Sequence, residues 1–289
     1  MLAAFVAYGI WGLLPIFVKL VDTVGSLEIV AQRIIWSLLL IVLILAARGA
    51  TGALIAVVRD QRLMRPLALS ATLIGVNWVT YVWAINSAHV LAASLGYFLN
   101  PLVNVLLGVL VLKERLRRGQ IVAIAVAALG VALMAAAALS TLWISVALAL
   151  TFGFYGLVRK LTPVAPMAGL GAETVVLAPM AFAYLGWLSA TGGLAFGRDI
   201  PTSALLICLG AVTMAPLVLF ATAARHLPMS TLGLLQYIAP TLQFLSGVLL
   251  FGETLSHGQI VSFGLIWAGL LLFALDSYMS ARRNRLAVV

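Results

Sequence analysis

Long apolar stretches follow one another along nearly the whole chain, separated by short polar segments. An apolar run of about 18 residues or more can cross the hydrocarbon core of a bilayer as a helix. The sequence contains ten such runs: 2–19, 27–47, 66–87, 91–112, 119–138, 142–158, 170–190, 203–224, 230–251 and 259–278. The longest connections, 48–65 and 191–202, cannot hold a soluble domain. We therefore expect an all-α integral membrane protein with ten transmembrane helices.

The composition agrees with this pattern. Hydrophobic residues make up 64% of the chain and charged residues 9%, whereas a soluble domain carries about 25% charged residues. A chain that lacks a polar exterior requires lipid around it, so the bilayer is its expected partner. The single cysteine, Cys208, excludes an intramolecular disulfide.

The polar positions inside the apolar runs repeat along the chain. Residues 94–122 read SLGYFLNPLVNVLLGVLVLKERLRRGQIV, and residues 233–261 read GLLQYIAPTLQFLSGVLLFGETLSHGQIV. The two segments align without a gap at an offset of 139 residues, which matches Pro101 with Pro240. A repeat of this kind in a membrane protein indicates two similar halves around a pseudo-two-fold axis.

This offset gives each half five helices, over residues 1–139 and 140–289. Because five is an odd number, the second half enters the membrane upside down, and the two halves become inverted-topology repeats around a central cavity. A weaker match of Trp11-Gly12-Leu13 with Tyr155-Gly156-Leu157 agrees with this division. Two inverted halves that exchange conformations provide alternating access to a site near mid-membrane.

Lysine and arginine residues are distributed unequally between the predicted loops. Fourteen of the 17 lie in loops that follow even-numbered helices, or in the C-terminal tail: Arg48, Arg59, Arg62, Arg65, Lys113, Arg115, Arg117, Arg118, Arg159, Lys160, Arg225, Arg282, Arg283 and Arg285. Basic loops remain in the cytoplasm, so we expect a multi-pass protein of the cell inner (plasma) membrane with both termini cytoplasmic. The net charge of +9 follows from this topology, and nucleic acid is not an expected partner.

Polar and aromatic residues inside the predicted helices share faces. The matching fourth and ninth helices each carry a stripe with spacings of three and four residues: Ser94, Tyr97, Pro101, Asn104 and Gly108, and Gly233, Gln236, Pro240, Gln243 and Gly247. The further candidates for a substrate pathway are Tyr8, Trp11, Asn77, Trp78, Tyr81, Asn100, Tyr155 and Tyr237. Polar groups are costly against lipid and should point inward; close helix–helix packing is the alternative explanation. Aromatic walls with a few amides suit an amphipathic organic solute rather than a bare ion.

Pro101 and Pro240 are candidate hinges. Each removes one backbone hydrogen bond from its helix and clashes with the preceding turn. We expect both helices to bend there, and a kink that is merely tolerated is the alternative.

Charged residues inside the predicted helices are rare and informative. Arg33 lies five residues after Glu28 in the second helix. We favour a structural or gating ion pair between them; contact with an anionic substrate group and snorkelling to the interface are the alternatives. Glu173, near the start of the seventh helix, is a weaker candidate for proton coupling.

The turns after the fourth and ninth helices carry matching carboxylates, Glu114 and Glu253. Each precedes a Gly-Gln-Ile-Val helix start by five residues, so we expect it to accept backbone N–H groups at a helix N-terminus. The helices that follow, 119–138 and 259–278, carry almost no polar groups. They are expected to face lipid or support the core, and are candidate homodimer surfaces.

Taken together, the pattern resembles the drug/metabolite transporter superfamily, EamA family. The segments ASLGYFLNPLVN, FYGLVRK, STLGLLQYIAPTLQFL and GVNWVTYVWAIN resemble its RarD/YddG-type branch, and the resemblance covers essentially the whole chain. It implies an inverted-repeat bundle whose cavity is formed mainly by helices 1, 3, 4, 6, 8 and 9. It also implies export of small metabolites such as amino acids, or of drug-like compounds.

Other function classes lack their residues. An intramembrane enzyme needs a nucleophile–base pair or a metal cluster, but the three histidines, His89, His226 and His257, lie at helix ends or in loops. The sequence has no ATP-binding GxxxxGK[ST] loop, and two proline-containing, aromatic-lined repeats favour a carrier over a channel. We therefore expect a secondary exporter of amino acids or related small amphipathic metabolites that works by alternating access, without enzymatic activity, metal or cofactor. Efflux of drug-like compounds such as chloramphenicol is the alternative.

Overall fold

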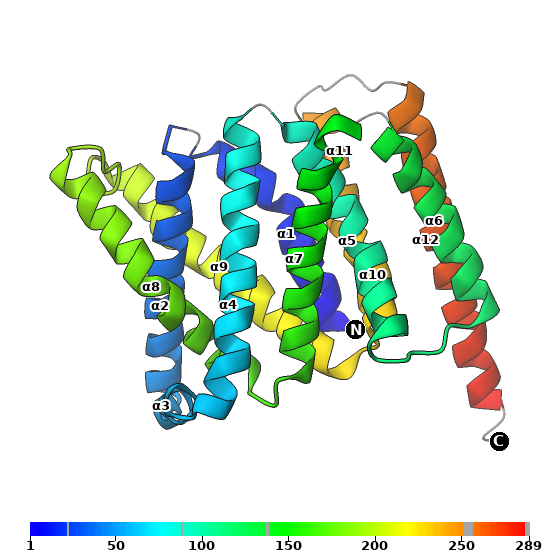
Figure 1. The fold of residues 1–289 in the computed structure, drawn as a ribbon, viewed down its shortest axis with the longest axis horizontal. Helices are drawn as coiled ribbons and strands as arrows, with labels where there is room; N and C mark the ends of the chain where they lie inside the picture. Colours follow the sequence, from blue (N-terminus) through cyan, green and yellow to red (C-terminus); the bar gives the residue numbers. More distant parts are fainter. Residues whose placement is uncertain (22, 88, 137–138, 251–256, 287–289) are drawn as a thin grey trace.

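The computed structural model describes residues 1–21, 23–87, 89–136, 139–250 and 257–286 (Figure 1). All regular secondary structure in these ranges is helical. The elements are α1 (Leu2–Lys19), α2 (Ser26–Ala47), α3 (Thr51–Arg59), α4 (Gln61–Asn86), α5 (Val90–Leu110), α6 (Arg118–Ala136), the 3-10 turn η1 (Leu139–Thr141), α7 (Leu142–Leu161), α8 (Pro166–Ala190), α9 (Ile200–His226), α10 (Met229–Gln236), α11 (Ile238–Leu250) and α12 (His257–Leu286).

Within the described residues, the predicted apolar runs lie almost entirely on helices. Eight of the described helices are long and apolar enough to cross a membrane, namely α2, α4, α5, α6, α7, α8, α9 and α12. The apolar segment of α1, Leu2–Leu14, is shorter, and the predicted span 230–251 is divided between α10 and α11. The expectation of an all-α chain with many candidate membrane helices is confirmed.

The prediction that residues 48–65 form only a connection is wrong. This segment contains α3, and α4 begins at Gln61, before the predicted start at residue 66. Leu54 and Val57 lie nearly one turn apart on α3 and are both buried, so burial of one apolar face explains the helix. Asp60 separates α3 from α4 and accepts a hydrogen bond from the backbone N–H of Arg62 at 2.8 Å.

The two matched prolines have different consequences. The helix is interrupted at Tyr237, between α10 and α11. The Tyr237 N–H donates to the Leu234 carbonyl in a tight turn. Pro240 lacks the N–H that would bond to the Gln236 carbonyl, which explains a break at this point. In contrast, α5 continues from Val90 to Leu110 through Pro101.

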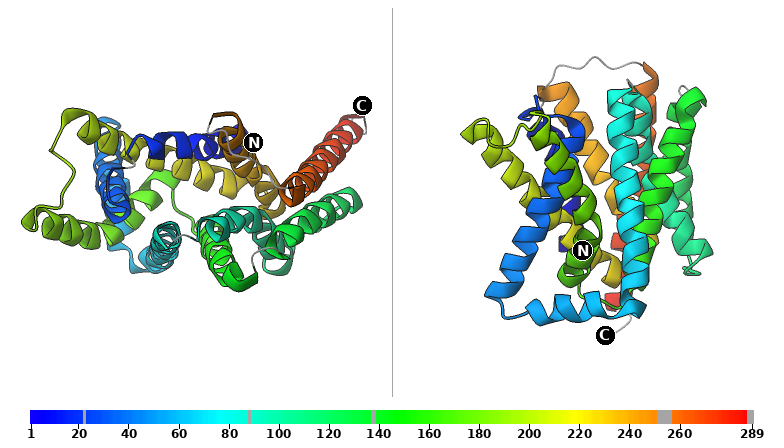
Figure 2. Two further views of the ribbon diagram at one scale, coloured as in Figure 1. Left: turned by 90° about the horizontal axis from the view of Figure 1, so that it is seen from above. Right: turned by 60° about the vertical axis from the view of Figure 1, so that its left-hand side comes forward.

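The helices α6 and α12 form a close antiparallel pair at one end of the bundle, with α2 and α8 at the other (Figures 1 and 2). A Cβ atom added to Gly130 would lie 2.6 Å from the Ser262 carbonyl oxygen, and one added to Gly269 would lie 2.7 Å from the Ala123 carbonyl oxygen. The offset of 139 residues relates Gly130 to Gly269 and Ala123 to Ser262. The same backbone contact is therefore made twice, once by a glycine of α6 and once by a glycine of α12.

A second pair of similar contacts involves α1 and α7. Gly12 of α1 lies against Leu242 of α11, and Gly153 of α7 lies against Val103 of α5. Val103 and Leu242 are related by 139 residues, so Gly12 corresponds to Gly153 rather than to Gly156. These contacts favour a pairing that differs from the tripeptide match by three residues, which is close to one helical turn.

One edge of the bundle collects the basic segments. The connections α2–α3, α5–α6, α7–α8 and α9–α10 and the end of α12 lie along the lower edge of Figure 1. The start of α1 and the end of α12 lie in the lower half of the same view. Fourteen of the 17 Lys and Arg residues lie in these segments, on α3, or on the helix ends that adjoin them, so the predicted segregation of charge has a matching spatial arrangement.

Candidate functional site

An aromatic cluster fills the space where α1, α7 and α9 meet. Trp11 contacts Tyr8, Phe152 and Phe220 with ring centroids 5.7–5.9 Å apart, and Tyr155 stacks on Phe220 at 6.1 Å. Tyr8 is fully buried and its hydroxyl donates to the Leu232 carbonyl at 3.1 Å. The predicted residues Tyr8, Trp11 and Tyr155 thus lie together, with Trp11 half-buried and the two tyrosines inside the core.

Two of the predicted amides connect neighbouring helices. Asn77 of α4 donates to the Leu148 carbonyl at 2.8 Å and to the Thr151 hydroxyl at 2.9 Å, both on α7. Gln243 of α11 donates to the Trp11 carbonyl of α1 at 3.0 Å. Because amides in an apolar surrounding need partners, these bonds fix the pairs α4–α7 and α1–α11.

The matching stripes of the two halves meet where α5 crosses α10. The Asn104 amide donates to the Gln236 side-chain oxygen at 2.6 Å, and both residues are buried. A Cβ atom on Gly233 would lie 2.6 Å from the Pro101 carbonyl oxygen, so glycine permits this close approach. The structure therefore brings together two stripe residues that lie 132 positions apart in the sequence.

Two more predicted residues near this crossing carry buried oxygens without partners. Asn100 and Tyr237 are both buried, and neither the Asn100 Oδ1 atom nor the Tyr237 hydroxyl has a hydrogen-bond partner among the described residues. Unpaired buried polar atoms are costly, which makes this neighbourhood a candidate for ligand contacts.

Two charged side chains, Glu114 and Lys160, bind helix ends beside this crossing at the basic edge. The Glu114 carboxylate accepts hydrogen bonds from the N–H groups of Met229 (2.6 Å) and Ser230 (3.0 Å) at the start of α10. The Lys160 ammonium donates to the Ala224 and Leu227 carbonyls at the end of α9. A carboxylate at a helix N-terminus and an ammonium at a helix C-terminus are both stabilising.

The expectation that Glu114 accepts N–H groups at a helix N-terminus is confirmed, but on an unexpected helix. Glu114 binds α10, in the other half of the molecule, rather than α6, which directly follows it. Its counterpart Glu253 lies outside the described residues.

The favoured ion pair between Glu28 and Arg33 is wrong for this structure. The Glu28 carboxylate instead accepts hydrogen bonds from the N–H groups of Ala195 (2.9 Å) and Phe196 (3.1 Å), in the α8–α9 connection. Five residues correspond to a rotation of about 140° around a helix, so the two side chains leave α2 on different faces.

Arg33 points into the bundle toward α4 and α9. Its Nε atom donates to the Thr213 hydroxyl at 3.0 Å, and its guanidinium carbon lies 4.4 Å from the centre of the Trp78 ring. Tyr81 and Tyr97 form an edge-to-face pair at 5.6 Å and lie within electrostatic range of Arg33. Arg33, Trp78, Tyr81 and Tyr97 all remain partly accessible.

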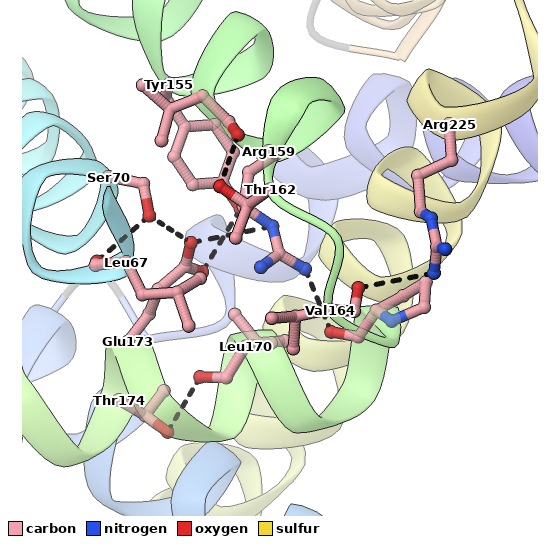
Figure 3. A network of polar contacts seen from close by, with 12 residues as sticks. Leu67, Ser70, Tyr155, Arg159, Thr162, Val164, Leu170, Glu173, Thr174 and Arg225 are labelled. Carbon is pink, nitrogen blue, oxygen red and sulfur yellow. Dashed lines mark hydrogen bonds and ion pairs between the residues drawn. The ribbon is translucent and has the colours of Figure 1, made fainter. Parts of the chain in front are cut away.

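A buried arginine was missed by the sequence analysis. Arg159, on α7, is 2% exposed and lies 3.5 Å from the Glu173 carboxylate, which is 1% exposed (Figure 3). The Ser70 hydroxyl donates to Glu173 at 2.5 Å, and Arg159 also donates to the Pro166 carbonyl at 3.0 Å. The predicted helix ended at residue 158 and left Arg159 in a loop, whereas α7 continues to Leu161.

This network joins α4, α7 and α8. Tyr155 adds its hydroxyl at 3.5 Å from the second Glu173 oxygen.

No cluster of three or more His, Cys, Asp or Glu side chains suited to a metal occurs in the part of the chain that the structure describes.

Comparison with known proteins agrees with this architecture. The profile of the EamA-like transporter family matches residues 1–136. The protein named Uncharacterized transporter PA0485, from Pseudomonas aeruginosa, is 46% identical over 279 residues, which cover 96% of this chain and 93% of that protein. Protein RarD of Streptomyces exfoliatus is 43% identical over 286 residues, with coverages of 99% and 91%.

More distant similarities extend the comparison. The Chloramphenicol-sensitive protein RarD of Pseudomonas aeruginosa is 33% identical over 279 residues, with coverages of 94% and 92%. A solved crystal structure with 20% sequence identity superimposes with a TM-score of 0.72 over 95% of this chain and 96% of that one. At this identity the structural match supports the fold alone.

Proposed function

Because this chain belongs to the RarD-type branch of the EamA-like transporters, in the drug/metabolite transporter superfamily, we propose that it is a secondary exporter of small amphipathic metabolites. Amino acids and related compounds are the proposed substrates. They leave the cytoplasm across the cell inner membrane, and the basic edge of the bundle faces the cytoplasm.

The reciprocal contact of α6 with α12 is the observation that carries this proposal. Gly130 meets the Ser262 carbonyl as Gly269 meets the Ala123 carbonyl, which supports two five-helix halves, residues 1–139 and 140–289, of inverted topology. In this arrangement α1 and the divided α10–α11 segment complete a set of ten spans. Inverted halves can exchange conformations, which is the physical basis of alternating access.

The uneven packing of α5 supports alternating access. The C-terminal half of α5 packs along α10 at the basic edge, where Glu114 holds the start of α10. In contrast, α5 makes few contacts with α11. In our proposal this conformation is closed toward the cytoplasm, and movement at the Tyr237 break and at the candidate hinges Pro101 and Pro240 reverses the access.

Aromatic and amide side chains in the interior support an amphipathic substrate. We propose that Trp78, Tyr81, Tyr97 and Asn100 line its path, and that Asn104 and Gln236 separate this path from the cytoplasmic edge. The alternative, efflux of drug-like compounds such as chloramphenicol, is favoured by the size of the aromatic cluster and by the name of one relative, Chloramphenicol-sensitive protein RarD.

Transport into proteoliposomes tests the proposal. Purified protein is reconstituted, and uptake of a radiolabelled amino-acid panel and of chloramphenicol is measured with and without a pH gradient. Saturable amino-acid uptake that other amino acids compete away supports the metabolite exporter, whereas chloramphenicol flux alone supports the alternative. Alanine at Trp78, Tyr97, Asn104 or Gln236 should reduce transport while membrane insertion is retained; normal transport by all four variants would contradict the assigned path.

A further inference from the structure

Arg33 is a cation inside the bundle without an acidic partner among the described residues. In the described ranges no Asp or Glu side chain lies within 4.0 Å of its guanidinium. Every described acid has a partner elsewhere: Glu28 with the Ala195 and Phe196 N–H groups, Asp60 with the Arg62 N–H, Glu114 with Met229 and Ser230, Glu173 with Arg159, Asp199 with the Thr202 N–H, and Asp276 with Arg117. An unpaired charge inside a membrane protein is costly and commonly functional.

The guanidinium is held, but its outer edge is left for a ligand. Thr213 takes the Nε–H group and Trp78 covers one face of the plane. No described residue accepts from the two terminal nitrogens, whose N–H groups form the fork that binds a carboxylate with two parallel hydrogen bonds. Contacts with α4 and α9 also exclude snorkelling along α2, because they direct the side chain into the bundle.

The surroundings of Arg33 suit the rest of an amphipathic molecule. The Trp78 ring lies against the Arg33 guanidinium, and Tyr81 and Tyr97 lie within electrostatic range of it. All three rings are partly accessible and provide apolar surface. A hydrated inorganic anion gains nothing from such walls, whereas an organic carboxylate places its charge on the guanidinium and its body on the rings.

We propose that Arg33 is the binding site for the carboxylate group of the transported substrate, with Trp78, Tyr81 and Tyr97 holding its apolar body. This inference rests on the proposed transport function and specifies its substrate class as small organic monocarboxylates, amino acids included. Thr213 positions the guanidinium rather than contacting the substrate.

Binding to the purified full-length protein tests the inference. Thermal stabilisation is titrated with the common L-amino acids, benzoate and phenylacetate, each compared with its carboxamide. At least one acid should bind about ten- to a hundredfold more tightly than its amide, the range expected for a charged hydrogen-bonded pair. Arg33→Gln should remove this preference, and Arg33→Lys, which keeps the charge but loses the fork, should retain only part of it.

The matched control is Arg198→Gln, since Arg198 lies in the exposed α8–α9 connection and donates to the Gly192 carbonyl. It should keep the full preference for acids. The inference is overturned when no acid binds better than its amide, when Arg33→Gln keeps the preference, or when sulfate or chloride displaces the acid at equal concentration.

Chloramphenicol, which has no carboxylate, separates this inference from the transport proposal. Equal chloramphenicol flux through wild-type and Arg33→Gln proteoliposomes, without any preference for acids, would support the transport function and contradict the carboxylate site. Absence of flux for every compound through the wild-type protein would remove the transport function itself.

Discussion

Two arginines inside this bundle differ in almost every contact. Arg159 lies beside the Glu173 carboxylate, donates to the Pro166 carbonyl and is nearly inaccessible. Arg33 lies on Trp78, donates to Thr213, has no acidic neighbour among the described residues and is partly accessible. The first charge is balanced by the protein, and the second is left for another molecule to balance.

The contacts of each arginine indicate whether its charge stabilises the fold or is available to a ligand. A buried ion pair whose members have further hydrogen bonds holds helices together, and removing one member strands the other. A cation that is anchored at one atom and open at its fork is organised for a ligand. Changes at Arg159 should therefore mainly reduce stability, whereas changes at Arg33 should mainly reduce binding.

The largest effect is expected for Arg159→Met. This change strands the Glu173 carboxylate between α4, α7 and α8, and should cost about 3–5 kcal/mol of stability. Thermal unfolding in detergent measures the loss, and the double variant Arg159→Met with Glu173→Gln should recover much of it. An Arg159→Met protein as stable as the wild type would break the comparison.

A smaller loss is expected for Glu28→Gln. The amide cannot accept the two N–H groups of the α8–α9 connection as strongly as the carboxylate does, so about 1–2 kcal/mol of stability should be lost. The preference for acids over amides should not change, because Glu28 does not contact Arg33. A changed preference would instead support an ion pair between Glu28 and Arg33.

Thr213→Val sharpens the comparison at the anchor of Arg33. The change removes the acceptor of the Nε–H group with little change in volume, so stability should fall by about 1 kcal/mol or less. Affinity for the preferred acid should fall a few-fold, since the guanidinium is less well positioned. The same titration measures this effect, and unchanged affinity would argue against a positioning role.

The smallest stability effect is expected for Arg33→Gln. Arg33→Gln loses the Thr213 hydrogen bond and the Trp78 contact, but it also removes a charge that has no acidic partner among the described residues. These terms oppose each other, so stability should change by about 0.5 kcal/mol or less, with either sign, although binding of acids is lost. Unfolding curves for Arg33→Gln and Arg159→Met, recorded together, provide the direct test. A large loss for Arg33→Gln would make both arginines structural.

Much of the candidate site could be predicted residue by residue, but few of the pairings could. The helical stripes singled out Asn104 and Gln236, which hydrogen-bond to each other, and the candidates Tyr81 and Tyr97 form an edge-to-face pair. Thr213 was not predicted, because a single hydroxyl in an apolar helix has no distinctive pattern.

The sequence by itself determined the apolar runs, the repeat and the separation of basic loops, because length, hydropathy and charge are local properties of the chain. Only the tertiary structure decided the partners of the charges. Glu28 meets Ala195 across 167 residues and Glu114 meets Met229 across 115. Such partners depend on which helices are neighbours and on which face each side chain leaves its helix, and neither is written in one segment alone.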